Sequence, residues 1–215
     1  MYVYQVDRVL LQEQVRKASN SLRGKTLNVG SGSFERYALP ESVTEYVRMD
    51  IAPGPNVDVV GRAERIPFPD ASFDSVLSTQ VFEHVEEPER AAAEIARVLT
   101  AGGVTVVTVP QWNELHEEPH DYWRYTRYGL QALFERYGFE LVSMEQRGGY
   151  YAVRAQMGMR FAMDKYRLHD HPVLGRLVSR FFKCTGTIAI WRDRHDPSPA
   201  NRKHTIGWCA VFKKV

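Results

Sequence analysis

The sequence predicts an α/β domain with a mostly parallel sheet, and three observations support this prediction. Short apolar strands alternate with helices along residues 25–149, the order that right-handed crossovers between parallel strands produce. The run 104–109 is rich in β-branched residues without clear polar alternation, as in a central strand covered on both faces. The chain has 215 residues, 44% of them hydrophobic, which suits one domain with a full core.

Each element follows from a local sequence pattern. We expect a helix over 5–22, because its apolar residues share one face and Gly24 ends it. Strands are expected at Thr26–Val29, Thr44–Ile51, Val57–Val60, Phe73–Thr79, Val104–Val109, Phe139–Glu145 and Ile206–Lys213. Helices are expected at Phe34–Leu39, Glu89–Leu99 and Thr126–Tyr137, with Ala101–Gly103 as a turn. Residues 150–191 have a helical pattern, whereas 192–204 contain Asp-Pro-Ser-Pro and are expected to form a loop.

Composition excludes several classes of protein. Two cysteines, Cys184 and Cys209, are too few for a disulfide framework or a cysteine-rich zinc module. No apolar run reaches the length of a membrane span, so no transmembrane segment is expected. Charged residues interrupt any signal-peptide core within the first 25 residues, which makes the cytoplasm the expected location.

The net charge of +2 hides a strong asymmetry. Residues 1–149 contain 15 Lys/Arg against 22 Asp/Glu, a balance of −7. Residues 150–215 contain 13 Lys/Arg against 4 Asp/Glu, a balance of +9. Such asymmetry indicates a partner or ligand of opposite charge for the basic end of the chain.

A glycine-containing turn follows the first expected strand. Gly30-Ser31-Gly32 suits a close approach of a ligand to the backbone, since glycine tolerates positive φ. Asp50 ends the next strand, where a carboxylate can accept hydrogen bonds from the ribose hydroxyls of an adenosine. The third glycine of a dinucleotide motif is missing, Glu35 would repel a pyrophosphate, and no P-loop lysine follows. The turn therefore favours an adenosine ligand without phosphate; a plain glycine-rich connection is the alternative.

Four segments, in this order and spacing, carry a resemblance to a known family. They are Leu27–Gly32, Ala63–Asp74, Val81–Val85 and Glu94–Leu99, the last followed by Gly102-Gly103. Together they resemble the motifs of class I S-adenosylmethionine-dependent methyltransferases of the methyltransferase type 11-like kind, over about residues 25–110.

The resemblance implies a fold and a function. The fold is a Rossmann-like, doubly wound, seven-stranded and mostly parallel sheet, with a helical insertion before the last strand. The single methyltransferase domain 1–215 would divide into an N-terminal helix at 1–24, a cofactor-binding core at 25–149, the insertion at 150–204 and a last strand at 205–215. The implied activity is methyl transfer from S-adenosyl-L-methionine to oxygen or nitrogen of a small molecule.

The resemblance also assigns cofactor-binding residues. Gly30 and Gly32 would line the methionine part of the cofactor, with Ser31 between them and Asn28 just before. Asp50 would hold the ribose and Ile51 would pack on the adenine. Ala63 and Glu64 would lie by the adenine edge, and Gln80 would neighbour the cofactor. The chain departs from the family at three positions, where Asn28 replaces an acid, Phe34 a glycine and Arg62 an aspartate.

The segment 110–126 supplies the candidate catalytic residues. It follows the fifth expected strand, and ligands of open α/β sheets bind beyond the carboxyl ends of the strands. His120, His116 and Tyr122 could face the acceptor, where a base assists transfer to a hydroxyl group. The alternative is that this segment only packs on the domain and caps the helix at Thr126. His84 is expected to be structural.

One pattern in this segment imitates a metal site. His116 and His120 match the zinc-protease spacing H-E-x-x-H, which binds metal only on a helix. Pro119 disfavours helical geometry there, so no metal is expected at this pair.

The basic end of the chain suggests partners. Residues 173–190 place apolar side chains near one face and Arg176, Arg180 and Lys183 on another. Packing on the domain, a lid over the acceptor or a homodimer contact is favoured, and peripheral contact with an anionic membrane is the alternative. No nucleic-acid-binding motif accompanies the basic residues.

The stretch His120–Thr126 resembles methyltransferases of cell-surface sugar or natural-product pathways, so the acceptor is expected to be a small and possibly anionic molecule. Two other functions stay open: a non-catalytic methyltransferase-like binding or scaffold protein, and an NAD-linked oxidoreductase, against which the missing glycine argues.

Overall fold

A computed structural model describes residues 3–32 and 37–215 of the chain. The chain divides into two compact units. The sheet unit comprises Gln14–Pro110, Leu115–Glu145 and Trp208–Val215, and the helical unit comprises Met1–Glu13, Gln111–Glu114 and Gln146–Gly207. None of the described helices combines the length and apolar character that crossing a membrane requires.

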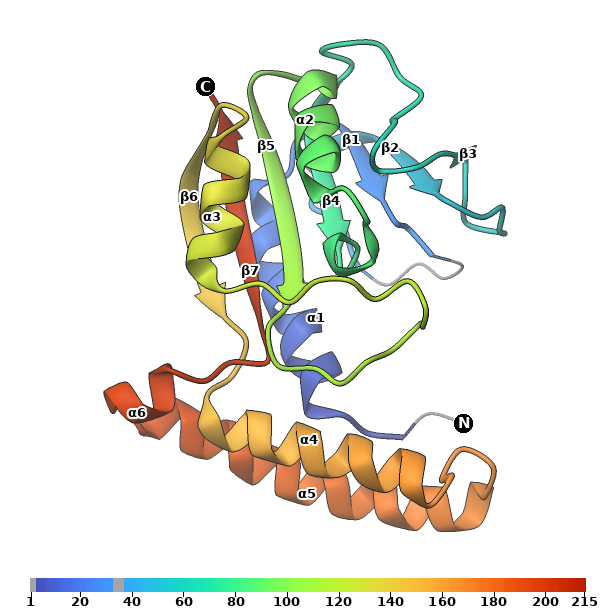
Figure 1. The fold of residues 1–215 in the computed structure, drawn as a ribbon, viewed down its shortest axis with the longest axis vertical. Helices are drawn as coiled ribbons and strands as arrows, with labels where there is room; N and C mark the ends of the chain where they lie inside the picture. The colour runs from blue at the N-terminus through green and yellow to red at the C-terminus, as the bar shows by residue number, and fades with distance from the viewer. Residues whose placement is uncertain (1–2, 33–36) are drawn as a thin grey trace. The chain divides into compact units, whose positions relative to one another are not determined.

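The sheet unit contains a seven-stranded sheet in the described part of the chain. Its strands are β1 (Gly24–Val29), β2 (Val43–Asp50), β3 (Val59–Val60), β4 (Phe73–Thr79), β5 (Leu99–Pro110), β6 (Phe139–Gln146) and β7 (Gly207–Lys214). Their order in space is β3-β2-β1-β4-β5-β7-β6, and the pairs from β3 to β5 are parallel. β7 runs opposite to β4 (Figure 1). The expected doubly wound, mostly parallel sheet is therefore confirmed.

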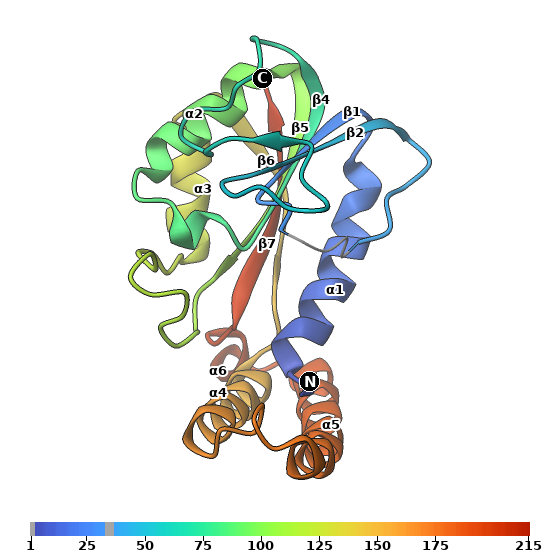
Figure 2. The same cartoon turned by 90° about the vertical axis from the view of Figure 1, so that its right-hand side faces the viewer.

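The core of the sheet unit lies where its helices meet the sheet. Helices α2 (Pro88–Val98) and α3 (Arg127–Glu135) lie on the same side of the sheet (Figure 2). The buried positions of α2 recur at helical spacing, which gives the helix one apolar face. From α3, Phe134 stacks on Phe212 of β7 with ring centroids 4.6 Å apart. The hydroxyl of Thr126 accepts the Gly129 amide N–H at 3.1 Å and so begins α3.

The helical unit is built on α4 (Tyr150–Lys165) and α5 (Pro172–His195), with the short α6 (Pro199–Arg202) and the first residues of α1 (Val6–Ala18). Its core includes Val3, Val6 and Leu10 together with buried residues of α4 and α5. The backbone of Arg147, just after β6, is hydrogen-bonded to the residues that lead into β7. Its carbonyl accepts the Ile206 N–H at 3.0 Å, and its N–H donates to the Gly207 carbonyl at 2.8 Å.

A carboxylate near the end of α5 caps the start of α4. Asp193 accepts amide N–H groups of Gly149, Tyr151 and Ala152 at 2.7, 3.1 and 3.0 Å. These amides have no partner within their own helix, so Asp193 satisfies donors that would otherwise depend on water.

Asp193→Ala is expected to lower the free energy of unfolding by roughly 2 kcal/mol, because a negatively charged cap on three amide groups is lost. Urea denaturation followed by circular dichroism measures the change. Asp170→Ala is the matched control, since Asp170 is exposed and forms only a surface pair with Arg167. Equal losses in the two variants would contradict the capping role.

Most expected elements are confirmed within one to three residues, and β4 matches at both ends. The helix expected over 5–22 ends as α-helix at Ala18 and continues as the 3-10 turn η1 (Ser19–Ser21). The third strand is shorter than expected, covering Val59–Val60 only. The expected helix Phe34–Leu39 begins at residues outside the described ones, and its described residues 37–39 are not helical, so the expectation is wrong for that part.

Two further expectations are wrong. Residues 192–204 are not all loop, because α5 continues to His195 and Ser198 caps α6, its hydroxyl accepting the Asn201 N–H at 3.2 Å. Ala101–Gly103 is not a turn but part of β5, which begins at Leu99. Gly102 takes a φ of +74° and the strand register shifts opposite it, so the glycines let the strand continue through an irregularity.

Candidate active site

The candidate site lies where the strand order of the sheet reverses. β1 pairs with β2 on one side and with β4 on the other. Starting from β1, the chain first adds β2 and β3 toward one edge of the sheet and then adds β4 and β5 toward the other edge. Ligands of doubly wound sheets bind at this point, outside the carboxyl ends of the strands. Gly30, Asp50 and Gln80 directly follow or end three of these strands.

The glycine turn has the backbone that the sequence predicts. Gly30 and Gly32 have φ values of +74° and +67°, which residues with side chains adopt only with strain. A Cβ added to Gly30 would lie 2.2 Å from Cγ2 of Val81, so the turn approaches the segment after β4 closely. The N–H groups of Gly30 and Ser31 both donate to the Met49 carbonyl, at 2.9 and 3.1 Å. Phe34 and Glu35 lie outside the described residues.

Asp50 is bonded to the turn. Its Oδ2 accepts the Gly32 N–H at 2.8 Å, and its Oδ1 accepts the Ala52 N–H at 3.3 Å. The backbone carbonyl of Asp50 accepts the Gly61 N–H at 2.9 Å, which brings the segment leading to Ala63 beside it. A carboxylate has about four acceptor positions, so Asp50 keeps capacity for ligand hydroxyl groups.

Asn28 provides a test of whether this region fits a polar ligand. It lies on β1 and is buried, and its side-chain oxygen has no hydrogen-bond partner among the described residues. Leaving a buried polar atom unsatisfied costs about 1–3 kcal/mol. A bound ammonium or hydroxyl group, directly or through water, would supply the missing donor, so the residues present fit a ligand such as S-adenosylmethionine.

The other expected cofactor residues lie around the same strand ends. Ile51 follows β2 and is 62% exposed, unusually open for an isoleucine. Ala63 is buried, and the Glu64 carboxylate pairs with Arg62 at 3.0 Å. Arg62 cannot replace the usual aspartate, because a guanidinium group has no hydrogen-bond acceptor. Gln80 has a φ of +54°, and its Nε2 donates to the Thr108 hydroxyl at 3.1 Å. Such strained backbone concentrates at functional sites.

The segment 115–126 is tied to the residues after β4. The N–H groups of Tyr122 and Trp123 both donate to the Glu83 carbonyl, at 2.8 and 3.2 Å, and the Trp123 indole donates to the Val85 carbonyl at 2.9 Å. Nδ1 of His84 lies 2.7 Å from the His120 carbonyl. His84, in the 3-10 turn η2 (Phe82–His84), thus anchors this segment, in keeping with its expected structural role.

His116 and Asp121 form the best-ordered acid–base pair of the segment. Oδ2 of Asp121 accepts the His116 backbone N–H at 3.0 Å and lies 3.4 Å from ring Nδ1. Both guanidinium nitrogens of Arg124 donate to the same carboxylate at 2.7 Å. Nδ1 is thus the ring nitrogen that faces Asp121, and Nε2 lies on the other side of the imidazole ring.

Asp121 is ionised at neutral pH. Its side chain is only 1% exposed, and burial alone would raise its pKa, but hydrogen bonds from Arg124 and the His116 N–H lower the pKa to about 2. The contribution of the Asp121 carboxylate to the stability of the folded protein is therefore fully present above pH ~4 and is lost as the pH falls toward 2. A permanently charged carboxylate can hold the His116 ring and stabilise it when it takes up a proton.

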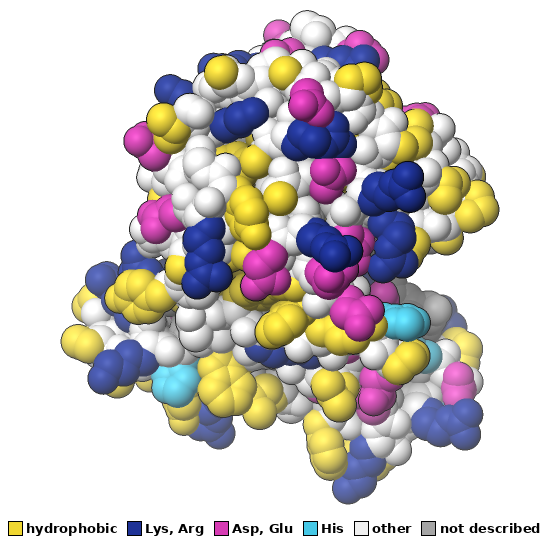
Figure 3. Space-filling view, turned by 45° about the horizontal axis from the view of Figure 1, so that its top comes forward, with side chains coloured by type: hydrophobic (Ala, Val, Ile, Leu, Met, Phe, Trp, Pro, Cys, Tyr) yellow, Lys and Arg dark blue, Asp and Glu magenta, His cyan; other side chains and the backbone are white. Residues whose placement is uncertain are grey.

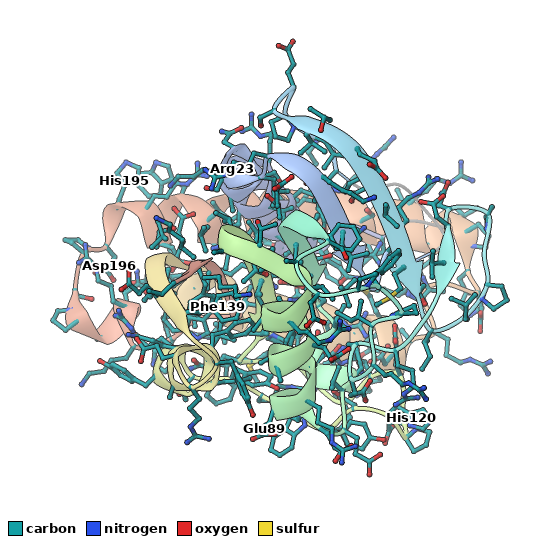
Figure 4. The ribbon with its side chains drawn as sticks, turned by 90° about the horizontal axis from the view of Figure 1, so that it is seen from above. Arg23, Glu89, His120, Phe139, His195 and Asp196 are labelled. Atoms are coloured by element: carbon teal, nitrogen blue, oxygen red, sulfur yellow. The ribbon has the colours of Figure 1, made fainter. Side chains whose placement is uncertain are left out.

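His120 and Tyr122 form a second and more open pair. Nδ1 of His120 lies 3.0 Å from the Tyr122 hydroxyl, and both side chains are solvent-accessible. Figure 4 shows His120 at the outside of the sheet unit, away from Phe139 in its core. The sequence offers both His120 and His116 as candidate catalytic residues, and of the two His116 is the one beside a buried carboxylate, that of Asp121.

Three residues of this region could hold a metal ion. Among the described residues, Glu83, His84 and His116 each bring one potential ligand atom to within 4.8 Å of the others. This is a donor set that zinc accepts. The sequence missed this group because Glu83 and His84 come from a different segment. Residues 115–126 are not helical, so His116 and His120 do not share a helix face.

Comparisons with known proteins match the part of the chain that contains the strand ends described above. The family model described as a methyltransferase domain matches residues 27–107. An uncharacterized methyltransferase of Mycobacterium sp. (strain KMS) is 38% identical over 101 residues, covering 41% of this chain and 40% of that protein. A "Probable S-adenosylmethionine-dependent methyltransferase" of Mycolicibacterium smegmatis is 42% identical over 57 residues, covering 26% of this chain and 22% of that protein. The chain thus spans less than half the length of these curated relatives.

Among solved structures, the cyclase SpnF aligns with a TM-score of 0.61 at 21% identity, covering 97% of this chain and 81% of that one. At this identity the likeness concerns the fold alone. Because that protein is named a [4+2]-cyclase, the fold by itself does not decide the reaction.

Proposed function

We propose that the chain transfers a methyl group from S-adenosyl-L-methionine to an oxygen or nitrogen atom of a small-molecule acceptor, because residues 27–107 match the methyltransferase-domain model and part of the chain is 38% identical to a methyltransferase. The observation that supports this most is the hydrogen bond between the Gly32 N–H and Asp50. It joins the glycine turn and the acidic residue at the switch point of the sheet. We also propose a cytoplasmic location, as the sequence indicates.

Cofactor binding is assigned to the residues at the strand ends. S-adenosylmethionine supplies, when bound, a methyl group already activated by a sulfonium charge. Gly30, Ser31 and Gly32 would let the backbone approach the methionine part, and the Asn28 oxygen would accept a hydrogen bond from its amino group, directly or through water. Asp50 would accept hydrogen bonds from the ribose hydroxyls. The adenine and its surroundings would be bordered by Ile51, Ala63, Glu64 and Gln80.

The protein's own chemistry is alignment and proton removal. Holding two reactants in line is worth roughly 7–11 kcal/mol of the barrier, so methyl transfer needs few catalytic groups. For a hydroxyl acceptor, Nε2 of His116 takes the proton while Asp121 holds the ring from the other side. His120 and Tyr122 contact the acceptor at the open side of the same segment. An amine acceptor would depend less on a base.

Calorimetric titration with S-adenosylmethionine and, separately, NADH tests the proposal. We expect saturable binding of S-adenosylmethionine and none of NADH. Tighter binding of NADH would favour an oxidoreductase, and no binding of S-adenosylmethionine would refute the proposal.

A turnover screen separates an enzyme from a binding protein. Release of S-adenosylhomocysteine in the presence of sugar, phenol and amine acceptors identifies transfer and the acceptor class. Cofactor binding without turnover on any acceptor, together with a stable protein partner, would instead support the non-catalytic alternative, which the amide at Asn28 keeps open.

A further inference from the structure

A row of large apolar side chains lies exposed along α5. Leu174, Leu177, Phe181, Ile188 and Trp191 are each 47–64% exposed, and Cys184, at the same spacing, is exposed as well. Steps of three and four residues place these six side chains on one side of the helix over about 26 Å. We call these six residues the α5 stripe.

The helical unit does not need the α5 stripe for its own core. The buried residues of α5 are Gly175, Phe182, Gly186 and Ala189, which lie on the opposite side of the helix. At Gly186 an added Cβ would come within 2.6 Å of the Tyr4 ring, so that face is closely packed. The helix is therefore apolar on two faces, one used inside the unit and one facing solvent.

The charge beside the α5 stripe is positive. Arg176, Arg180 and Lys183 flank its first half, and no ion pair with an acidic side chain is found for them in the described part of the chain. The single acidic residue of α5, Asp193, is engaged by the amides of α4. Figure 3 shows one face of the molecule, on which hydrophobic and basic side chains lie next to one another in the lower part of the view, together with some acidic and histidine side chains.

We propose that the α5 stripe docks the protein on an anionic phospholipid surface, with Leu177 and Phe181 entering the acyl boundary and Arg180 and Lys183 meeting the phosphates. A helix with an apolar face beside a basic face lies in the plane of such a membrane. A second copy of the chain fits less well, because paired stripes would bring the basic residues together without an acidic partner on α5. The sequence favoured packing on the domain, a lid or a homodimer contact for this helix and gave contact with an anionic membrane as the alternative; the exposed apolar row beside basic residues is the reason to take up that alternative.

Vesicle sedimentation tests the proposal with the full chain and needs no catalytic activity. We expect binding to vesicles of phosphatidylcholine with 30% phosphatidylglycerol, little binding to pure phosphatidylcholine vesicles, and release at high salt. Absent binding, or equal binding to both vesicles, would overturn it. The outcome is independent of the methyltransferase proposal, which cofactor titration decides separately.

Variants locate the surface. Leu177→Ser with Phe181→Ser is expected to lower the partition coefficient at least tenfold, and Arg180→Gln with Lys183→Gln to weaken binding to anionic vesicles only. Tyr128→Ser, an exposed aromatic of the sheet unit, is the matched control and should bind as the parent does. Circular dichroism confirms folding of each variant. Analytical ultracentrifugation completes the test: a dimer that Leu177→Ser with Phe181→Ser dissociates would assign the stripe to a second copy instead.

Discussion

Replacing Asp50 by alanine is expected to weaken S-adenosylmethionine binding by roughly 10- to 100-fold, the equivalent of one hydrogen bond to a charged group, about 1.5–3 kcal/mol. Two effects combine: the ribose hydroxyls lose their acceptor, and the Gly32 N–H loses the bond that ties the turn to β2. Calorimetric titration measures the change in Kd.

Two variants separate these effects. Asp50→Asn keeps an acceptor for the Gly32 N–H but loses the charge, so it is expected to retain the turn and only part of the affinity. Asp70→Ala removes an exposed carboxylate elsewhere in the sheet unit and should bind the cofactor normally. Unchanged affinity in Asp50→Ala, with the protein folded, would rule out the ribose role.

Replacing His116 by alanine is expected to lower kcat by roughly 10²- to 10⁴-fold with a hydroxyl acceptor, because the general base is removed. Cofactor affinity should not change, since His116 is assigned to the acceptor side. Steady-state kinetics with the acceptor found by the turnover screen measure the effect. Asp121→Asn should reduce kcat as well, because the amide no longer stabilises a protonated ring.

His120→Ala and His169→Ala complete this comparison. A larger loss in His120→Ala than in His116→Ala would move the base to the open pair, and His169→Ala, at an exposed position of the helical unit, should behave as the parent. A chelator is expected to leave the parent's activity intact. Activity lost with EDTA and restored by zinc would assign Glu83, His84 and His116 to a metal ion.

Much of the sheet unit was predictable because its signals are local. β4 has the expected bounds, Phe73–Thr79, and its strand is bordered by the turn residues Asp70-Ala71-Ser72 on one side. β5 was harder, because Ala101-Gly102-Gly103 has the composition of a turn and only the pairing with β4 shows that the chain stays extended. The end of α5 was missed although it has a distant role, since Asp193 near that end caps the start of α4 through amides 41–44 residues earlier.

The candidate cofactor residues and the candidate catalytic residues also differ in how well the sequence predicts them. The contact between Gly32 and Asp50 follows from the sequence, because both residues end neighbouring parallel strands. The choice between His116 and His120 does not, since it depends on the burial of Asp121 and its bonds to Arg124. Glu83 and His84 carried one available signal, the Val81–Val85 motif, but nothing in it indicates that they lie beside His116.

The hydrogen bonds between Arg147 and the Ile206–Gly207 backbone mean that the chain leaves for the helices and comes back at nearly one point. The 58 residues between these points share their hydrophobic core with Val3, Val6 and Leu10 of the N-terminal segment. Exchange of this insertion in evolution would therefore require matching changes at those three residues, while the strands of the sheet could keep their order.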